Sequence, residues 1–275
     1  MSAPPTFDSS GYWEKRLREH FDDQGAGFLR LGRRYNRWMY RVRGEVFDRM
    51  VDRHLGRRGR EEAPLRVLDV GSGTGFYVHR WRRLGADVTG LDLTEVAVHR
   101  LAANFPDSRF LRADIGRPLE GELNALIGTM DAVSAFDVLF HVVDDDDYVQ
   151  ALRNVGRLLR PAGLFVWSDN FLHGSTARSR HHVSRSLVDV TSALADAGLT
   201  EVDRVPMFVL MNYPTDTRSR LLQLVWTAMV SPAIASDRLG GALGALLYPI
   251  ERRLVRRVRE SPTTELMVCV KRAST

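Results

Sequence analysis

The chain has 275 residues, 44% hydrophobic and 27% charged, a composition typical of one large globular domain or a domain with an appendage. Its single cysteine, Cys269, excludes an intrachain disulfide framework and a cysteine-based zinc site. The net charge of +5 allows a nucleic acid or an anionic surface as partner, but the basic residues are scattered, which favours an arginine-rich composition. Residues 1–20 lack the apolar core of a secretory signal, and no run approaches the roughly 18 apolar residues of a membrane span, so we expect a cytoplasmic protein.

Strand-like and helix-like segments alternate through the middle of the chain. Strands are predicted at 65–71, 86–93, 108–115, 130–136 and 164–170. Helices are predicted at 76–85, 95–105, 144–163 and 187–197; the third begins in a run of aspartates, and the last begins with a capping box of Ser186 and Asp189. This alternation predicts an α/β fold, a doubly wound and mostly parallel sheet with helices on both faces.

Two segments lie outside the alternation. Residues 1–60 are predicted to form a helical cap or lid, and 213–262, rich in leucine and then in arginine, an insert before the final strand at 264–271. The core domain then comprises 61–212 and 263–275. The insert is expected to act as a second lid over the site, as a contact surface for a second copy of the chain, or as a helix lying on a membrane surface.

Three glycines at alternate positions follow the first strand, in the sequence VLDVGSGTGFY (67–77). Ligands of open α/β sheets bind beyond the carboxyl ends of the strands, which is where these glycines fall. No lysine follows as in a phosphate-binding P-loop, and Phe76 stands where a dinucleotide fingerprint needs its third glycine. Asp69, two residues before the first glycine, suits an ammonium or sulfonium ligand.

The glycine segment resembles the first motif of the class I S-adenosylmethionine-dependent methyltransferases, in particular their bacterial small-molecule branch. The resemblance continues in order over about residues 65–200, with RADI (112–115), AFDVLFHVVDD (135–145) and RLLRPAGLFVWSDN (157–170) similar to later motifs. It implies a Rossmann-like sheet of seven strands, the last of them antiparallel. It also implies S-adenosylmethionine as methyl donor and S-adenosylhomocysteine as product.

The resemblance implies a cofactor site as well. Asp92 would bind the ribose hydroxyls, and Asp114 with Ile115 would form the adenine-binding turn. Tyr12, Trp13 and Arg16 resemble a lid that closes over the cofactor in some members. The remaining expected cofactor residues are Asp69, Gly71, Ser72, Gly73, Gly75, Tyr77, Leu93 and Phe136.

In this family the residues after the fourth strand face the transferable methyl group. His141 is the first candidate for the general base, since histidine titrates near neutral pH, although packing would also explain a histidine there. Asp137 belongs to the same segment, Asp169 could orient a base or hold a metal, and His182 is a second candidate base. Metal dependence is not expected, because no strong metal-binding motif is present and a helix N-terminus accounts for the aspartates at 144–147.

The acceptor site is predicted around the segment after the fifth strand, where histidines and arginines cluster. These side chains favour an anionic or polyhydroxylated acceptor. The alternative is that the segment is a solvated loop that binds no acceptor. The chain lacks the Asn-Pro-Pro-Tyr type of motif of base-amine methyltransferases and any RNA-binding module. We therefore predict O-methylation of a sugar, glycolipid or natural product, with an RNA methyltransferase or a non-catalytic cofactor-binding partner protein as alternatives. The expected acceptor residues are Phe140, His173, His181, Arg178, Arg185 and Tyr35.

Overall fold

A seven-stranded sheet forms the centre of the computed structural model, which describes residues 7–56 and 63–272. Its strand order is β3-β2-β1-β4-β5-β9-β8, and β9 runs antiparallel to the other six strands of the sheet. The predicted doubly wound α/β fold and its antiparallel last strand are confirmed. The strands are β1 (Arg66–Val70), β2 (Asp87–Asp92), β3 (Arg109–Arg112), β4 (Met130–Phe136), β5 (Leu159–Asp169), β8 (Leu199–Pro206) and β9 (Glu265–Lys271).

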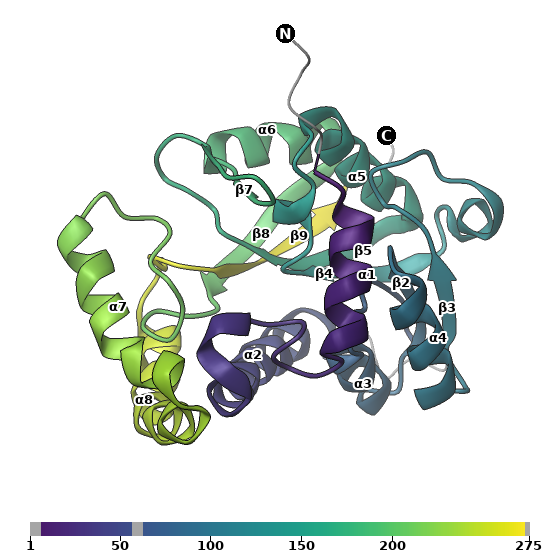
Figure 1. Ribbon diagram of the computed structural model, residues 1–275. Helices are drawn as coiled ribbons and strands as arrows, with labels where there is room; N and C mark the ends of the chain where they lie inside the picture. Colours follow the sequence, from purple (N-terminus) through teal and green to yellow (C-terminus); the bar gives the residue numbers. More distant parts are fainter. Residues whose placement is uncertain (1–6, 57–62, 273–275) are drawn as a thin grey trace, which may run out of the picture.

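Helices cover both faces of the sheet (Figure 1). One face carries α5 (Asp145–Leu158) and α6 (Leu187–Asp196), and the other carries α3 (Phe76–Arg83) and α4 (Glu95–Asn104). Each face has its own apolar core, and Trp81 of α3 reaches the sheet, where its indole N–H donates to the Ser134 hydroxyl (3.0 Å). Short 3-10 turns at Leu29–Leu31, Gly121–Leu126 and Leu139–His141 (η1, η3 and η4) complete the connections.

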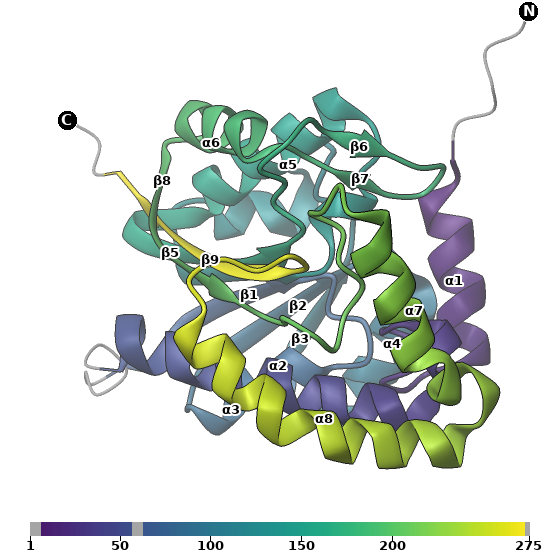
Figure 2. The same ribbon diagram turned by 90° about the vertical axis from the view of Figure 1, so that its left-hand side faces the viewer.

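The N-terminal segment forms α1 (Ser9–Glu19) and α2 (Gly32–Leu55), and the insert folds into α7 (Arg220–Ala235) and α8 (Asp237–Arg257). Helix α2 and the two helices of the insert pack together on the same face as α3, whereas the first helix, α1, lies at the edge of the sheet beside α4 (Figure 2). Figure 2 shows α8 running beside α2. Their contacts include a hydrogen bond from the Trp38 indole to the Gly241 carbonyl (3.0 Å). No helix of the described residues has both the length and the apolar character needed to cross a membrane.

Helix starts follow their sequence signals closely, whereas several ends differ. Asp144 caps α5, accepting from the amides of Asp146 and Asp147, as the aspartate run predicts. Ser186 caps α6, but the Asp189 carboxylate accepts from Thr176 and does not complete the capping box. The prediction that the helix extends to 163 is wrong: β5 begins at Leu159, which pairs with Met130, and Ala162 turns the chain at a φ of 59°.

Strand boundaries also shift. The third strand is shorter than predicted. Strand β8 ends at Pro206, after which the amides of Met207 and Phe208 donate to the Thr264 carbonyl. A small hairpin, β6 (Ala177–Arg178) and β7 (Val183–Ser184), was not predicted. This hairpin brings the histidine-rich segment 173–186 to the edge of the site.

Candidate active site

A cavity of about 650 Å³ lies at the carboxyl ends of β1, β2 and β4, beneath α1 and α2. The glycine loop, the end of β2 and the loops after β3 and β4 form its walls. Phe7, Trp13 and Leu17 from the N-terminal segment line it from above, together with Tyr40 and Arg43 of α2. No residue of the insert 213–262 lines the cavity.

The glycine loop approaches the cavity with its backbone. Gly71, Gly73 and Gly75 have φ values of 67°, 52° and 87°, and a Cβ on Gly71 would collide with the Val138 side chain. The Gly73 amide donates to Asp92 Oδ2 (2.8 Å), while Asp92 Oδ1 accepts from the amide (2.9 Å) and hydroxyl (2.7 Å) of Thr94. Three donors thus fix a buried carboxylate at the cavity wall.

Most of the expected cofactor residues line this cavity, and four do not. The Asp69 carboxylate lies behind the loop, where it accepts from the Ser134 hydroxyl (2.5 Å), and burial raises its pKa to about 7. The lining set comprises Trp13, Gly71, Ser72, Gly73, Tyr77, Asp92, Leu93, Asp114, Ile115 and Phe136, and the non-lining set Asp69, Gly75, Tyr12 and Arg16.

Arg16 and Tyr12 act on the cavity only through neighbours. The Arg16 guanidinium donates to the carbonyls of Gly25 (2.7 Å) and Gly27 (2.5 Å) and to the Tyr12 hydroxyl (3.1 Å). It also lies over the Trp13 ring. These contacts tie α1 to the segment leading into α2 and hold Trp13 at the cavity.

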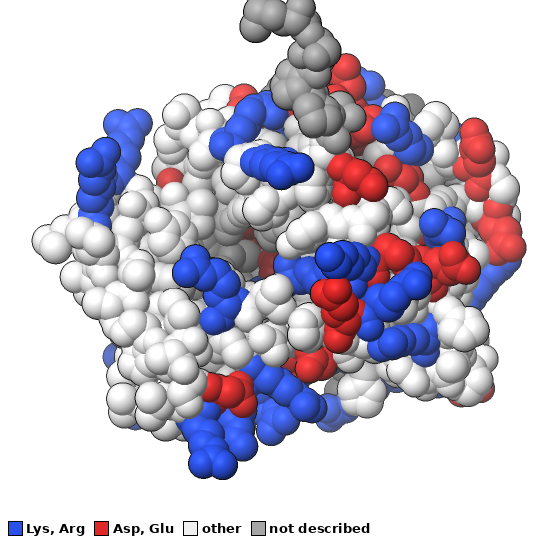
Figure 3. Space-filling model, in the orientation of Figure 1, with Lys and Arg blue, Asp and Glu red and all other residues white. Residues whose placement is uncertain are grey.

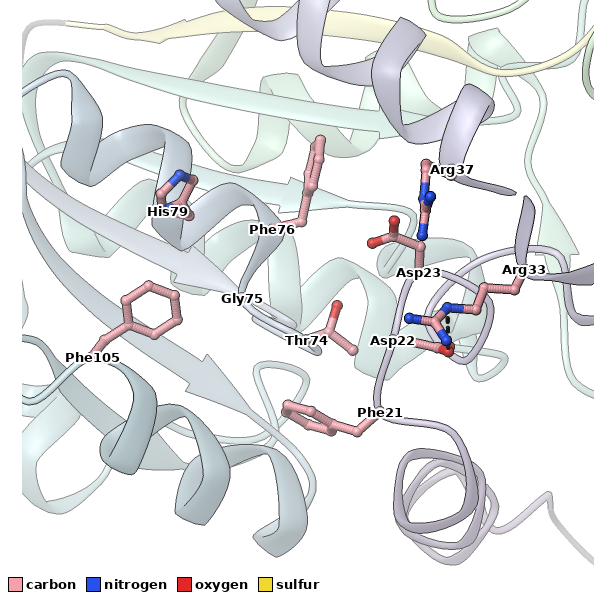
Figure 4. Close-up of a pocket in the computed structure, with 10 residues that line it drawn as sticks. All are labelled: Phe21, Asp22, Asp23, Arg33, Arg37, Thr74, Gly75, Phe76, His79 and Phe105. Carbon is pink, nitrogen blue, oxygen red and sulfur yellow. Dashed lines mark ion pairs between the residues drawn. The ribbon is translucent and has the colours of Figure 1, made fainter. Parts of the chain in front are cut away.

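Gly75 faces a second cavity of about 360 Å³ on the outer side of the glycine loop (Figure 4). Thr74 and Phe76 separate it from the first cavity and line both. An ion pair between Asp22 and Arg33 (3.6 Å) lies on its other side.

His141 lines the main cavity with a defined tautomer. Its Nδ1 lies 2.9 Å from the His181 carbonyl oxygen, and because a carbonyl only accepts, Nδ1 must carry the proton. Nε2 is then the unprotonated nitrogen of the neutral ring. Burial lowers the pKa of His141 to about 4, and the edge of Trp13 packs against the ring (centroids 4.9 Å apart).

His182 has its Nε2 engaged. The Asn170 amide nitrogen lies 3.2 Å from it and the Ser184 hydroxyl 3.0 Å, and the amide orientation is set by Thr264, whose hydroxyl donates to Asn170 Oδ1 (2.9 Å). Burial lowers the pKa of His182 to about 4, and its ring stacks on Phe140. His182 does not line the cavity.

Arg43 of α2 is a cavity residue that the sequence reading missed. Its guanidinium forms a buried ion pair with Asp137, which has a φ of 58° and accepts from the Ser168 hydroxyl (2.6 Å). Arg43 Nε and the Tyr77 hydroxyl are both buried at the cavity and have no hydrogen-bond partner among the described residues. A polar ligand would satisfy them, which fits a cofactor or an acceptor bearing oxygen atoms.

Asp169 lies outside the cavity. It is buried at the end of β5, accepts from the Asn170 amide (2.6 Å), and burial raises its pKa to about 8. Among residues 7–56 and 63–272, no group of three or more His, Cys, Asp or Glu side chains is arranged to hold a metal ion.

None of the expected acceptor residues lines the cavity. His173 pairs with Asp216 (2.6 Å), which raises its pKa, and both Arg178 and Arg185 pair with Asp145. Each of these cations therefore has a carboxylate partner within the protein.

The three uncharged or aromatic members of that set also lie elsewhere. Tyr35 is fully buried between α2 and the segment before α7, and its hydroxyl donates to the Met211 carbonyl (3.1 Å). His181 stacks on Tyr12 at the rim of the cap, and Phe140 is buried against His182.

Known proteins share both the sequence pattern and the fold. Residues 67–163 match the family model described as a methyltransferase domain. The ubiquinone biosynthesis O-methyltransferase of Methylobacterium nodulans is 28% identical over 195 residues, 65% of this chain and 76% of that protein. The protein of the same name from Methylocella silvestris is 34% identical over 125 residues, 46% of this chain, and the match spans less than half (44%) of its length.

A solved structure gives the same fold over almost the whole chain. The 1,6-didemethyltoxoflavin N1-methyltransferase of Burkholderia thailandensis, with bound S-adenosylhomocysteine, superimposes with a TM-score of 0.51 at 20% identity. The match covers 99% of this chain and 94% of the other. Sequence motifs, sheet order and family model agree: residues 67–163 carry a methyltransferase domain, and the chain is similar to class I S-adenosylmethionine-dependent methyltransferases.

Proposed function

We propose that this methyltransferase O-methylates a small molecule, the hydroxyl of a sugar, glycolipid or natural product. The observation that carries the proposal is the tautomer of His141, whose Nδ1–H donates to the His181 carbonyl and leaves Nε2 free to take a proton. A base matters for an alcohol, because a hydroxyl is a weak nucleophile, and general-base catalysis contributes about 10²–10⁴-fold. The O-methyltransferase names of the two relatives support oxygen as the acceptor atom.

The cofactor would lie along the glycine loop. We assign binding of the cofactor's ribose hydroxyls to Asp92 and of its adenine to Asp114 and Ile115. The backbone of Gly71–Gly73 would contact the remaining part of the cofactor. When bound, S-adenosylmethionine supplies a methyl group already activated by its sulfonium.

The protein's own groups would then position and deprotonate the acceptor. Trp13 and Phe7 exclude water from above, and the Arg43–Asp137 pair fixes the cavity wall next to Phe136. His141 accepts the hydroxyl proton at Nε2. His182 and Asp169, which lie outside the cavity, support the wall but take no part in proton transfer.

The test uses methyl-labelled S-adenosylmethionine and an extract of the source organism separated into polar, lipid and RNA fractions. We expect label in the polar or lipid fraction with the wild type, and much less label with His141→Gln or with Asp92→Ala. Label lost on adding a chelator would implicate a metal. Label only in RNA, or none in any fraction despite cofactor binding, would contradict O-methylation of a small molecule.

A further inference from the structure

Helix α7 exposes aliphatic side chains that nothing in the described protein covers. Only Trp226, Val230 and Ala233 of its sixteen residues are buried. Leu221 is 72% exposed and Leu224 67%. Eight of the thirteen exposed large hydrophobic residues of the described chain lie on α7 and α8, and we call them the α7–α8 apolar surface: Leu221, Leu222, Leu224, Val225, Ile234, Leu239, Leu246 and Ile250.

Figure 3 shows a broad uncharged surface over α7 and α8, on the left of the view, with basic side chains at its edges. Single exposed leucines are ordinary on soluble proteins, but a gathered set on two adjacent helices marks an interaction surface. The surface is separate from the catalytic cavity, which the insert does not line.

The same segment carries most of the net positive charge of the chain. Residues 213–262 contain eight arginines and four acidic residues, a net charge of +4, whereas the whole chain has +5 and the rest therefore +1. All four acidic residues are already engaged. Glu251 is buried and accepts from the amides of Val209 and Leu210, Asp237 pairs with Arg34, and Asp216 and Glu260 pair with His173.

Most of these arginines are free to meet an external anion. Arg252 and Arg256 pair with Glu45. The other six are exposed and form no ion pair with any described residue: Arg218, Arg220, Arg238, Arg253, Arg257 and Arg259.

We propose that the α7–α8 apolar surface docks on an anionic membrane, with its leucines in the bilayer interface and the unpaired arginines on lipid phosphates. Amphipathic helices bind such interfaces through buried apolar area together with attraction to anionic lipid. A second copy of the chain fits less well, because a symmetric contact would bring two sets of arginines together. RNA would engage the arginines but leave the leucines exposed.

The experiment is co-sedimentation of the full chain with vesicles of phosphatidylcholine alone or of equimolar phosphatidylcholine and phosphatidylglycerol. We expect binding to the anionic vesicles only, weakened by salt. Two variants separate the contributions: Leu221→Ser/Leu224→Ser/Leu246→Ser and Arg218→Gln/Arg220→Gln/Arg253→Gln. Each variant should bind the anionic vesicles at least about tenfold more weakly. The leucine variant loses apolar area that would be buried in the bilayer interface, and the arginine variant loses electrostatic attraction to the anionic lipid.

The matched control is Val188→Ser/Val202→Ser, which removes two exposed valines outside the insert and should bind as the wild type does. Circular dichroism and S-adenosylhomocysteine binding show that each variant is folded. Absence of vesicle binding by the wild type, or equal binding by all variants, would overturn the proposal. A dimer in sedimentation velocity that only the leucine variant dissociates, or arginine-dependent binding of labelled RNA without vesicle binding, would overturn it in favour of those partners.

Discussion

Arg43 on α2 and Asp137 after β4 form an ion pair inside the cavity, with only 8% and 20% of their side chains exposed. The pair joins the N-terminal cap to the carboxyl edge of the sheet, where the cavity lies. It also holds Asp137 at a φ of 58°, a conformation that non-glycine residues keep only when their surroundings enforce it. The position of the cap over the cavity therefore depends on a contact between residues 94 positions apart in sequence.

Removing Arg43 should strongly destabilise the protein. Arg43→Ala leaves the Asp137 charge buried without its partner, which we expect to lower the free energy of unfolding by about 3–5 kcal/mol in urea denaturation. The control is Arg53→Ala on the same helix, whose arginine is half exposed in its pair with Asp203 and should lose only about 0–1 kcal/mol. Equal losses in the two variants would show that the Arg43 pair has no special structural role.

The glycine loop should tolerate no side chain at Gly71. Gly71→Ala combines a φ of 67° with a collision against Val138, so we expect it to abolish S-adenosylhomocysteine binding in calorimetry. Gly85→Ala, at a φ of 79° but in open space, should lose only the roughly 1–2 kcal/mol of a left-handed alanine and bind normally. Normal binding by Gly71→Ala would contradict the close backbone approach proposed for this loop.

The two partly buried histidines should differ in their kinetic importance. His141→Gln is expected to lower kcat by about 10²–10⁴-fold, whereas His182→Gln, with Nε2 already engaged by Asn170, should retain most activity. Because burial lowers the pKa of His141 to about 4, the base is unprotonated at neutral pH, and kcat should fall only below about pH 5. The rates are measured with the fraction that accepts label, and a reversed order would move the base to His182.

Asp169 makes stability depend on pH in a defined direction. Burial raises its folded pKa to about 8 from 3.8, so the protonated carboxyl stabilises the fold at low pH and this contribution is lost as pH rises towards 8. The slope approaches about 1.4 kcal/mol per pH unit between these values. Asp169→Asn cannot ionise, so its unfolding free energy relative to the wild type should rise from pH 5 to pH 8 and level off above. A constant difference across this range would show that Asp169 is ionised in the folded protein.

Local signals in the sequence predicted the sheet, the glycine loop and Asp92, because strand periodicity and the spacing of a βα turn are encoded by neighbouring residues. They could not predict ion pairs between distant segments. His173 and Arg185 look like ligand-binding cations in sequence, yet Asp216 and Asp145 neutralise them once the chain is folded. Tyr35 was expected in the acceptor pocket, because the sequence does not show which side of its helix faces the core. Only the packing of α2 shows that Tyr35 is buried in the core.

Arg43 did leave a signal. It continues the four-residue spacing of Tyr35 and Met39 on the buried stripe of α2, where an apolar side chain is expected. An arginine at such a position needs a buried anion, but its identity, Asp137, comes only from the tertiary structure.

We propose that the cavity between the glycine loop and the cap holds S-adenosylmethionine, with Asp92 binding the ribose. Calorimetric titration with S-adenosylhomocysteine tests it most directly, using the wild type, Asp92→Ala and the exposed control Asp107→Ala. We expect the wild type and Asp107→Ala to bind alike and Asp92→Ala to bind about 10–100-fold more weakly, the loss of a hydrogen bond to a charged group. Equal affinity for all three proteins would show that Asp92 does not bind the ribose, and no binding by folded wild type would show that the cavity is not a cofactor site.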